Sequence, residues 1–214
     1  MIKSKSWNWD IVSAGPWWLE PASEVYPLIS RWKSKGFKKF LDLGCGLGRH
    51  SILFAKEGFD VSATDLGKEG LEKLKNRAKE QGLPIEIKLA DMVSLPYEDS
   101  SFDCLLAFHT IYHQDDEGIK KVIREIKRVL KDKGEAFITF NSKENSTFKD
   151  RGAKRISDNT LIKTKGHEAG IPHYYADKTD VENLLKDFKI RELFYKEEPY
   201  SEYTSTHFFV LVQK

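Results

Sequence analysis

Two stretches of the sequence combine residue types that could hold a nucleoside-containing ligand. The segment Gly44-Cys45-Gly46-Leu47-Gly48 follows one apolar run, and Asp65 ends the next apolar run. Glycine tolerates positive φ and lets the backbone approach a ligand closely. In an open parallel sheet, ligands bind beyond the carboxyl ends of the strands, and an acid about 20 residues after the glycine turn can accept both hydroxyls of a ribose. The alternative role for Asp65 is to cap the helix that follows.

The spacing of the glycines separates two classes of ligand. A dinucleotide-binding fingerprint has the pattern G-x-G-x-x-G. This segment has G-x-G-x-G, and Arg49 stands where the third glycine of the fingerprint would fall. The spacing therefore argues against a nicotinamide-dependent oxidoreductase, which is kept as an alternative function.

Histidine and aromatic side chains gather after two further segments. His109, Tyr112 and His113 follow a predicted strand, and His173 and Tyr174 follow a long polar stretch. Histidine can act as a general base where an acceptor must lose a proton, and His109 or His113 is the candidate here. These two histidines are four residues apart, as in zinc-binding H-E-x-x-H helices, but a threonine replaces the glutamate and no third ligand is evident. We therefore predict no metal site.

The elements that must position these residues follow a regular order. Apolar runs predict strands over residues 37–43, 59–64, 85–90, 102–108 and 135–140, and periodic apolar positions predict helices over 47–56, 68–81 and 117–130. Such alternation implies a parallel sheet with right-handed crossovers and helices on both faces. Two β-like runs at the end, 190–198 and 205–212, predict an antiparallel pair joined through Pro199, Ser201 and Glu202. A capping box beginning at Thr179 predicts a helix that ends at Phe188.

The fold class predicted is therefore α/β: a Rossmann-like, doubly wound, mostly parallel sheet of seven strands with an antiparallel last strand. We expect one domain over residues 1–214, with an N-terminal cap segment over 1–36 and a polar insertion over 141–175. Long polar segments of this kind are usually functional lids, and a solvated insertion is the equal alternative. The tryptophans of the cap, which could either line a pocket or simply pack on the sheet, are Trp7, Trp9, Trp17 and Trp18.

Composition excludes several broad classes. The chain has 214 residues and a formal net charge of +2, from 35 basic and 33 acidic residues, which argues against a dedicated nucleic-acid binder. Its two cysteines, Cys45 and Cys104, form no C-x-x-C pair and no disulfide framework. No run approaches the roughly 18 apolar residues of a membrane span, and no apolar signal segment is present. We expect a cytoplasmic protein, and nothing in the sequence indicates an oligomeric state.

Three segments together resemble a known family, and the predicted terminal strand pair is compatible with the reversed last hairpin of that family. The three segments are LDLGCGLGRHSILFAKEGFDVSATD, LADMVSLPYEDSSFDCLLAFHTIYH and REIKRVLKDKGEAFIT. They are similar to the motifs of class I S-adenosylmethionine-dependent methyltransferases, in particular the small-molecule group that includes ubiquinone and menaquinone biosynthesis enzymes. The resemblance extends over residues 37–140, and the ends of the chain match poorly.

The resemblance implies a role for individual residues. S-adenosylmethionine would be the cofactor and S-adenosylhomocysteine the product. Nine residues would contact the cofactor. In order from its methionine part through the ribose and adenine to the sulfonium, they are Asp42, Gly44, Cys45, Gly46, Asp65, Leu66, Asp91, Met92 and Phe108. The residues that would line the acceptor pocket are Trp18, Tyr112, His173 and Tyr174.

The function that follows is transfer of a methyl group to a small-molecule acceptor by in-line displacement, with His109 or His113 as a base if one is needed. A methyltransferase acting on RNA or protein is the first alternative, supported by the basic residues of the insertion, which are Lys149, Arg151, Lys154, Arg155, Lys163 and Lys165. The loop AFHTIYH lacks the N/D-P-P-Y/F pattern of enzymes that methylate amino groups of bases or glutamine. A cofactor-binding module without activity is a further alternative.

Overall fold

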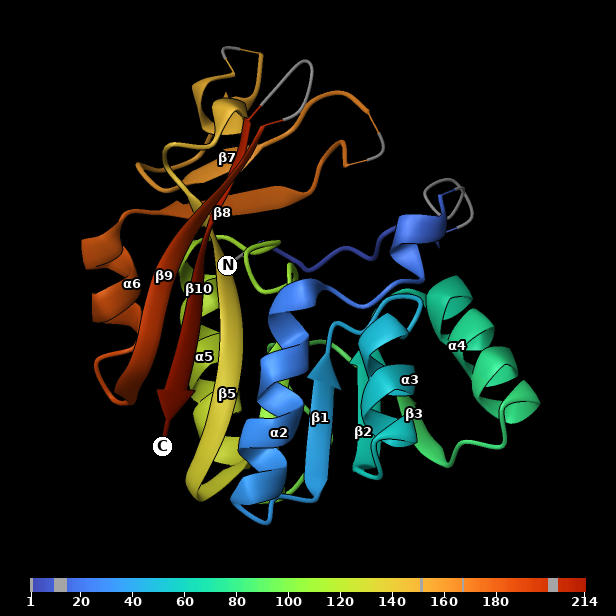
Figure 1. The fold of residues 1–214 in the computed structure, drawn as a ribbon. Helices are drawn as coiled ribbons and strands as arrows, with labels where there is room; N and C mark the ends of the chain where they lie inside the picture. The colour runs from blue at the N-terminus through green and yellow to red at the C-terminus, as the bar shows by residue number, and fades with distance from the viewer. Residues whose placement is uncertain (1, 10–14, 151, 167, 200–203) are drawn as a thin grey trace.

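The computed structural model describes residues 2–9, 15–150, 152–166, 168–199 and 204–214. Within these residues the main sheet has the strand order β3-β2-β1-β4-β5-β10-β9 (Figure 1). Its strands are β1 (Lys39–Leu43), β2 (Asp60–Asp65), β3 (Ile85–Leu89), β4 (Phe102–Ala107), β5 (Leu130–Ser142), β9 (Lys189–Pro199) and β10 (Thr204–Gln213). β10 is antiparallel to β5 and β9, and the other neighbouring pairs are parallel. The predicted Rossmann-like sheet with a reversed last strand is confirmed.

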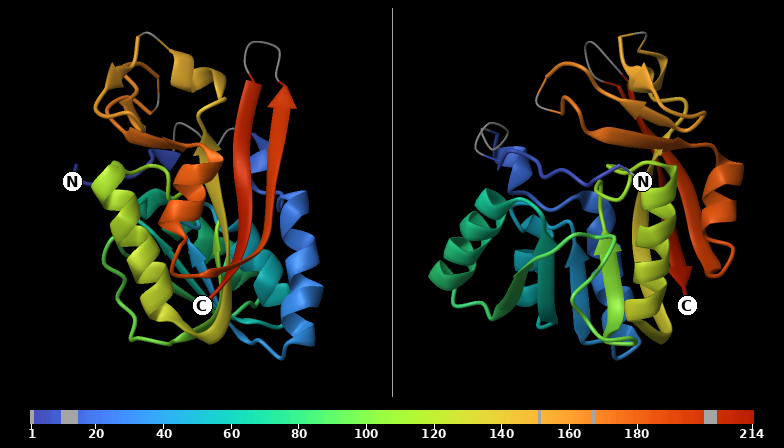
Figure 2. Two further views of the ribbon diagram at one scale, coloured as in Figure 1. Left: turned by 90° about the vertical axis from the view of Figure 1, so that its left-hand side faces the viewer. Right: turned by 180° about the vertical axis from the view of Figure 1, so that it is seen from behind.

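Helices cover both faces of this sheet (Figure 2). On one face lie α2 (Tyr26–Ser34) and α3 (Arg49–Lys56), whose apolar side chains pack with those of β1 and β4. On the other face lie α5 (Asp116–Val129) and α6 (Lys178–Leu184). α4 (Lys68–Glu80) packs beside β2 and β3. Three short 3₁₀ turns complete the described helices: η1 (Pro16–Trp18), η2 (Ser23–Val25) and η3 (Ser146–Lys149).

The sequence of α5 explains both its start and its buried face. The Asp115 side chain accepts a hydrogen bond from the Gly118 N–H at 2.8 Å, which satisfies one of the unpaired donors of the first turn. The apolar residues of the helix recur at intervals of three and four and are buried against the sheet; they are Ile119, Val122, Ile123, Ile126 and Val129. β5 begins directly after this helix and is longer than the predicted strand, since strand pairing starts at Leu130.

The predicted start of α6 is wrong. Asp177, not Thr179, caps this helix: its side chain accepts from the Asp180 N–H at 2.9 Å, and the Asp180 side chain accepts from the Asp177 N–H at 3.0 Å. Two overlapping capping patterns are present in the sequence, and the extended backbone that ends the preceding strand selects the earlier one, with Asp177 at φ −92° and ψ 179°. The helix ends at Leu184, before the predicted end at Phe188.

A buried ion pair joins α2 to the start of the main run of β5. The Glu135 carboxylate, which has no exposed surface, accepts from Arg31 Nε at 2.8 Å and Arg31 Nη2 at 2.9 Å. Trp32 Nε1 donates to the same carboxylate at 3.1 Å. The positive charge of Arg31 lowers the Glu135 pKa against the effect of burial, so this acid is held ionised.

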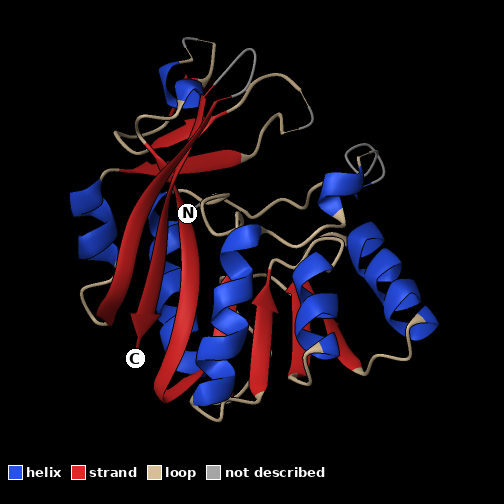
Figure 3. Ribbon diagram, viewed as in Figure 1, coloured by secondary structure: helices blue, strands red, loops and turns tan. Residues whose placement is uncertain are grey.

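The polar insertion carries strands of its own (Figure 3). They are β6 (Lys154–Arg155), β7 (Thr160–Ile162) and β8 (Pro172–Ala176). β6 and β7 are antiparallel, β7 and β8 are antiparallel, and β8 pairs in parallel with Asn141 and Ser142 at the end of β5. Sequence patterns did not predict these strands, because the buried run of β8 contains a proline and a histidine and looks too polar.

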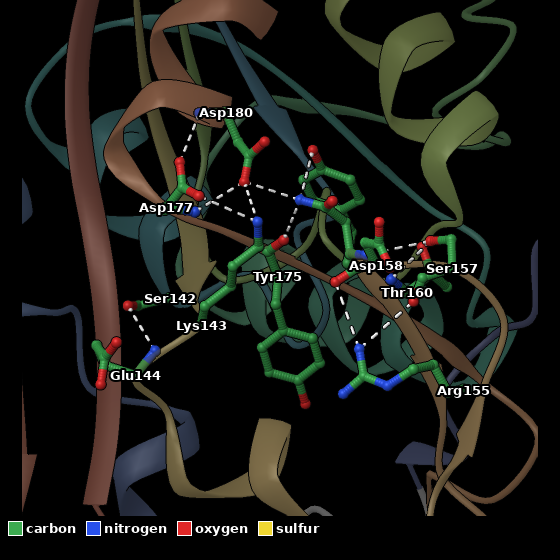
Figure 4. Close-up of polar contacts among 12 residues, drawn as sticks. Ser142, Lys143, Glu144, Arg155, Ser157, Asp158, Thr160, Tyr175, Asp177 and Asp180 are labelled. Carbon is green, nitrogen blue, oxygen red and sulfur yellow. Dashed lines mark hydrogen bonds and ion pairs between the residues drawn. The ribbon is translucent and has the colours of Figure 1, made fainter.

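Polar contacts hold the insertion to the rest of the fold (Figure 4). Lys143 Nζ lies 3.1 Å from the Asp177 carboxylate and 2.6 Å from that of Asp180. Within the insertion, the Tyr175 hydroxyl lies 2.8 Å from Thr147 Oγ1. The insertion is therefore attached to α6 through Lys143 and to β5 through β8. Among the helices described, none combines the length and apolar character needed to cross a bilayer.

Candidate functional site

A cavity of about 590 Å³ lies at the carboxyl ends of the central strands. This volume is within the range of roughly 300–1,000 Å³ that is usual for small-molecule sites. Of the residues predicted to bind the cofactor, those lining the cavity are Gly44, Cys45, Gly46, Asp65, Leu66, Met92 and Phe108. Of those predicted for catalysis and the acceptor, the lining residues are Trp18, His109, Tyr112, His113 and His173. Both predicted sets thus border one cavity.

Three predicted residues lie outside the cavity wall. Asp42 is buried beneath the glycine turn, where its carboxylate accepts from Ser51 Oγ at 2.6 Å, and burial raises its pKa to about 6. Asp91 accepts from Ser4 Oγ at 3.0 Å and from the Val93 N–H at 3.2 Å. The Tyr174 hydroxyl lies 3.4 Å from Asn159 Nδ2, within the insertion.

The glycines of the turn adopt the positive φ values that glycine tolerates and most other residues do not. Gly44 has φ of 69°, and its N–H donates to the Thr64 carbonyl at 2.8 Å. A Cβ at Gly44 would lie 1.9 Å from Thr110 Oγ1, so no side chain fits there. Gly46 has φ of 53° and Gly48 has φ of 74°. The chain can therefore leave β1, reverse beside β2 and enter α3 with its backbone facing the cavity.

Asp65 is fixed beside this turn by two backbone donors. The Gly46 N–H donates to Oδ2 at 2.9 Å, and the Gly67 N–H donates to Oδ1 at 2.7 Å. Burial raises the Asp65 pKa, and these hydrogen bonds oppose that effect. An ionised carboxylate has about four acceptor positions, so each oxygen can still accept from a ligand. The N-cap of α4 is Gly67 and not Asp65, but the bond from the Gly67 N–H to Asp65 lies at that helix start, so Asp65 also supports the beginning of α4.

The N-terminal segment, residues 2–9, runs across the carboxyl-end side of the central strands (Figure 1), and its Trp7 and Trp9 line the cavity. The rings of Trp7, Trp9 and Trp18 pack together with centroids 5.6–5.7 Å apart, and all three line the cavity. The Trp9 indole lies against backbone: a Cβ at Gly46 would come within 2.4 Å of its ring, and one at Gly67 within 2.6 Å. Trp17, by contrast, is 63% exposed and lies outside this wall.

The other side of the cavity carries several neutral imidazoles. Burial lowers the pKa of His109 well below its ordinary value, with a further lowering by the nearby His207. Burial also lowers the pKa of His113 to about 4 and that of His207 to about 4. His207 lies on β10, with its ring centroid 4.2 Å from that of His109. Sequence reasoning missed His207, since a single histidine in an apolar strand gave no signal beyond its type.

Several charged residues that line the cavity were also missed as site residues, among them Arg49 and Glu168. Arg49, at the start of α3, lies over the Phe108 ring with its guanidinium carbon 5.5 Å from the centroid. Glu168 lies in the insertion, between β7 and β8, and approaches His113 and His173. Glu168 is 55 residues from His113 in the chain (168 − 113), so no local motif could have joined them.

The described residues contain one group that could hold a metal ion. It comprises His113, Glu168 and His173, whose ligand atoms all lie within 4.8 Å of one another. His109 is not part of it, so the four-residue spacing of His109 and His113 plays no part in this group, and the prediction of no metal site did not consider Glu168 or His173. The chain therefore assembles a possible ligand set from distant segments instead of from one helix.

Comparison with known proteins agrees with this architecture. Residues 40–134 match the family model described as "Methyltransferase domain". Norajmaline N-methyltransferase from Rauvolfia serpentina is 36% identical over 99 residues, which cover 45% of this chain and 33% of the relative. The ubiquinone biosynthesis O-methyltransferase of Chromobacterium violaceum is 29% identical over 136 residues, which cover 59% of this chain and 58% of the relative. The chain thus spans between a third and three fifths of the length of these two relatives.

The fold is shared more completely than the sequence. A solved structure of an S-adenosylmethionine-dependent methyltransferase from Methanosarcina mazei superposes with a TM-score of 0.74, at 23% identity, covering 92% of this chain and 99% of the other. The motifs on which the resemblance was based fall inside the matched region. The sequence match of residues 40–134 to the methyltransferase domain model and the fold shared with this solved structure thus agree with one another.

Proposed function

We propose that the chain transfers a methyl group from S-adenosylmethionine to a small-molecule acceptor. The observation that carries the proposal is that one cavity is bordered by the glycine turn and Asp65 on one side and by His109, Tyr112 and His113 on the other. A two-substrate reaction needs such an arrangement, because the reacting atoms must be held in contact. Holding them in position can supply up to about 7–11 kcal/mol of the barrier.

On the donor side, backbone and carboxylate groups suit the parts of the cofactor. Asp65 would accept the ribose hydroxyls, and Leu66 and Met92 would contact the adenine. Arg49 lines the same cavity and would attract the carboxylate of the methionine part, since guanidinium groups pair well with carboxylates. Asp42 and Asp91 lie outside the cavity wall. Asp42 would support the glycine turn from below, and Asp91 would interact with the edge of the adenine. When bound, the cofactor supplies an activated methyl group.

On the acceptor side, the residues are better suited to excluding water than to acting as strong bases. A histidine with a pKa near 4, such as His113, is neutral at pH 7 and is a weak base. Without a bound metal ion, the roles proposed for His109 and His113 are therefore to orient the acceptor by hydrogen bonding and to take up a proton only transiently. The aromatic faces of Trp18 and Tyr112 would attract the positive charge of the donor, an effect of about 0.5–2 kcal/mol.

The size and cover of the cavity support a small acceptor. Trp9 from the N-terminal segment and His173 from the insertion line the same cavity as Gly46, so we propose that segments 1–36 and 141–175 act as covers within one functional unit over 1–214. The two relatives are named as an N-methyltransferase and an O-methyltransferase, so the proposal extends to the class of acceptor and not to the atom or to the ubiquinone and menaquinone group.

The alternative of an RNA or protein substrate gains no support from the insertion. Lys163 pairs with Glu168 inside the cavity, and Lys149 pairs with Glu144 at 3.6 Å. Arg155 lies over the Phe148 ring, and Arg151 lies outside the described residues. Several basic residues of the insertion thus already make local contacts within the chain, which weakens the case for a phosphate-binding surface there.

Calorimetry with S-adenosylhomocysteine tests the proposal. The wild-type chain should bind it, and Asp65→Asn should weaken binding by about 10- to 150-fold, because hydrogen bonds to a charged group contribute about 1.5–3 kcal/mol. Asp60→Asn is the matched control, since Asp60 is exposed at the other end of the same strand. Absence of binding by the wild type, or equal binding by the Asp65 and Asp60 variants, would contradict the proposal. Released S-adenosylhomocysteine over a metabolite panel would then identify the acceptor.

A further inference from the structure

Three side chains from separate segments converge on one point of the cavity wall. His113 follows β4, Glu168 lies between β7 and β8, and His173 lies on β8. Glu168 Oε1 is 3.2 Å from His173 Nε2 and 3.7 Å from His113 Nε2. A single carboxylate oxygen therefore faces two imidazole nitrogens, and all three residues line the cavity.

The orientation of His173 is fixed from behind. Its Nδ1 lies 3.0 Å from the Ile171 carbonyl oxygen, which can only accept, so Nδ1 carries the proton and donates. In a neutral imidazole held in this way, Nε2 carries the lone pair. The side chain is 2% exposed, and its Nε2 faces Glu168 Oε1 at 3.2 Å. A carbonyl that holds the far nitrogen of a histidine is the usual support for a metal-binding imidazole.

Glu168 is oriented in the same manner. Lys163 Nζ binds Oε2, the carboxylate oxygen that does not face the histidines. This contact leaves Oε1 directed at His113 and His173.

We propose that His113, Glu168 and His173 bind a divalent transition-metal ion of the zinc class, with its remaining coordination position open to the cavity. Two imidazoles and one carboxylate are the protein ligands of several catalytic zinc sites, and imidazole suits zinc and its neighbours among the transition metals. Bonds of about 2.1 Å in a tetrahedral site separate ligand atoms by about 3.4 Å. The distances of 3.2 Å and 3.7 Å already bracket that value.

The open position gives the ion a chemical use. A zinc ion lowers the pKa of a bound water or hydroxyl, so that the oxygen becomes nucleophilic near neutral pH. At this place it would bind a hydroxyl or thiol acceptor and would supply the activation that the weakly basic histidines do not. This use rests on the proposed methyl transfer, whereas binding of the ion does not.

Zinc binding to the full chain, prepared without a histidine tag and dialysed against a chelator, tests the site. We expect one zinc ion per chain by equilibrium dialysis with elemental analysis, and a rise in melting temperature on adding zinc, because a ligand bound only by the folded state stabilises it. His173→Ala and Glu168→Gln should each weaken binding by about 10- to 100-fold or more, which is the loss seen even for outer-shell partners. His207→Asn, a buried histidine of the same cavity outside the cluster, should retain the ion.

Two results would overturn the proposal. One is a wild-type chain that retains no zinc and shows no zinc-dependent rise in melting temperature. The other is a loss of zinc binding in His207→Asn as large as that in His173→Ala. Binding of S-adenosylhomocysteine is measured on the same metal-depleted samples: if it persists while zinc binding is absent, the metal site alone is refuted, and if zinc binds but S-adenosylhomocysteine does not, the proposed methyl transfer fails instead.

Discussion

Replacement of Gly44 by alanine should destabilise the fold in two separable ways. The backbone of Gly44 has φ of 69°, and a left-handed conformation disfavours an L-residue by about 1–2 kcal/mol. The added Cβ would also lie 1.9 Å from Thr110 Oγ1 and 2.6 Å from Thr110 Cβ. Overpacking of a buried site lowers stability by about 1–3 kcal/mol. The two effects together predict a loss of about 2–5 kcal/mol for Gly44→Ala.

Gly58→Ala isolates the backbone effect. Gly58 has φ of 84°, and a Cβ there would meet no atom within 4 Å. The difference between the two variants in free energy of unfolding, measured by urea denaturation, should therefore equal the packing term of about 1–3 kcal/mol. For a chain of this size that difference corresponds to about 2–12 °C in melting temperature.

Thr110→Gly provides the internal check, because it removes the atoms that the new Cβ would meet. In that background, Gly44→Ala should be no more harmful than Gly58→Ala. If Gly44→Ala is no worse than Gly58→Ala in the wild-type chain, or if Thr110→Gly leaves the difference unchanged, the packing account of the glycine turn is wrong.

Three further perturbations address charge, pH and the aromatic wall. Glu135→Ala should lower the free energy of unfolding, measured by urea denaturation, by about 3 kcal/mol. This is the low end for a broken buried ion pair, because the arginine partner is partly exposed. The control Glu57→Ala, at an exposed position, should change it by no more than about 0.5 kcal/mol. Stability should fall as pH drops from 6.5 to 4, because the folded chain keeps His207 neutral with a pKa of about 4 while the unfolded chain protonates it. This one group accounts for about 2 kcal/mol at pH 5. The loss should be smaller in His207→Asn, and equal pH profiles for the wild type and this variant would contradict the role of His207. Trp9→Ala should lower stability by about 3–5 kcal/mol and Trp17→Ala, at an exposed position, by no more than about 0.5 kcal/mol; equal melting temperatures would refute the contrast.

The parts of this fold that the sequence predicts are those with local causes. β1 and β2 are short apolar runs followed by glycines or an acid, and the stripe of α5 has the helical period, so their type and order follow from neighbouring residues. The reversed pair β9 and β10 was predicted for the same reason, although the turn assigned to Ser201 and Glu202 lies outside the described residues. Their arrangement follows from general rules on parallel sheets.

The parts that could not be predicted depend on contacts across long stretches of chain. β8 has no apolar alternation, and it is a strand because the end of β5 offers it hydrogen bonds. Glu168 acquires a role only where the insertion returns over His113. Most residues proposed to contact the cofactor were therefore placed on the cavity wall by motifs, whereas Glu168 and His207 on the opposite wall were missed, since they come from segments with weak local patterns.

The pairing of β8 with β5 has a consequence for how molecules reach the cavity. Swinging the insertion outward would break backbone pairing at Asn141 and Ser142 and the contacts of Lys143 with α6. The N-terminal segment is tied down as well: the Ile2 N–H donates to Asp115, Ser4 bonds to Asp91 and Gln114, and Lys73 donates to the Trp9 carbonyl. A molecule that enters or leaves the cavity must therefore break polar contacts of one of these two segments.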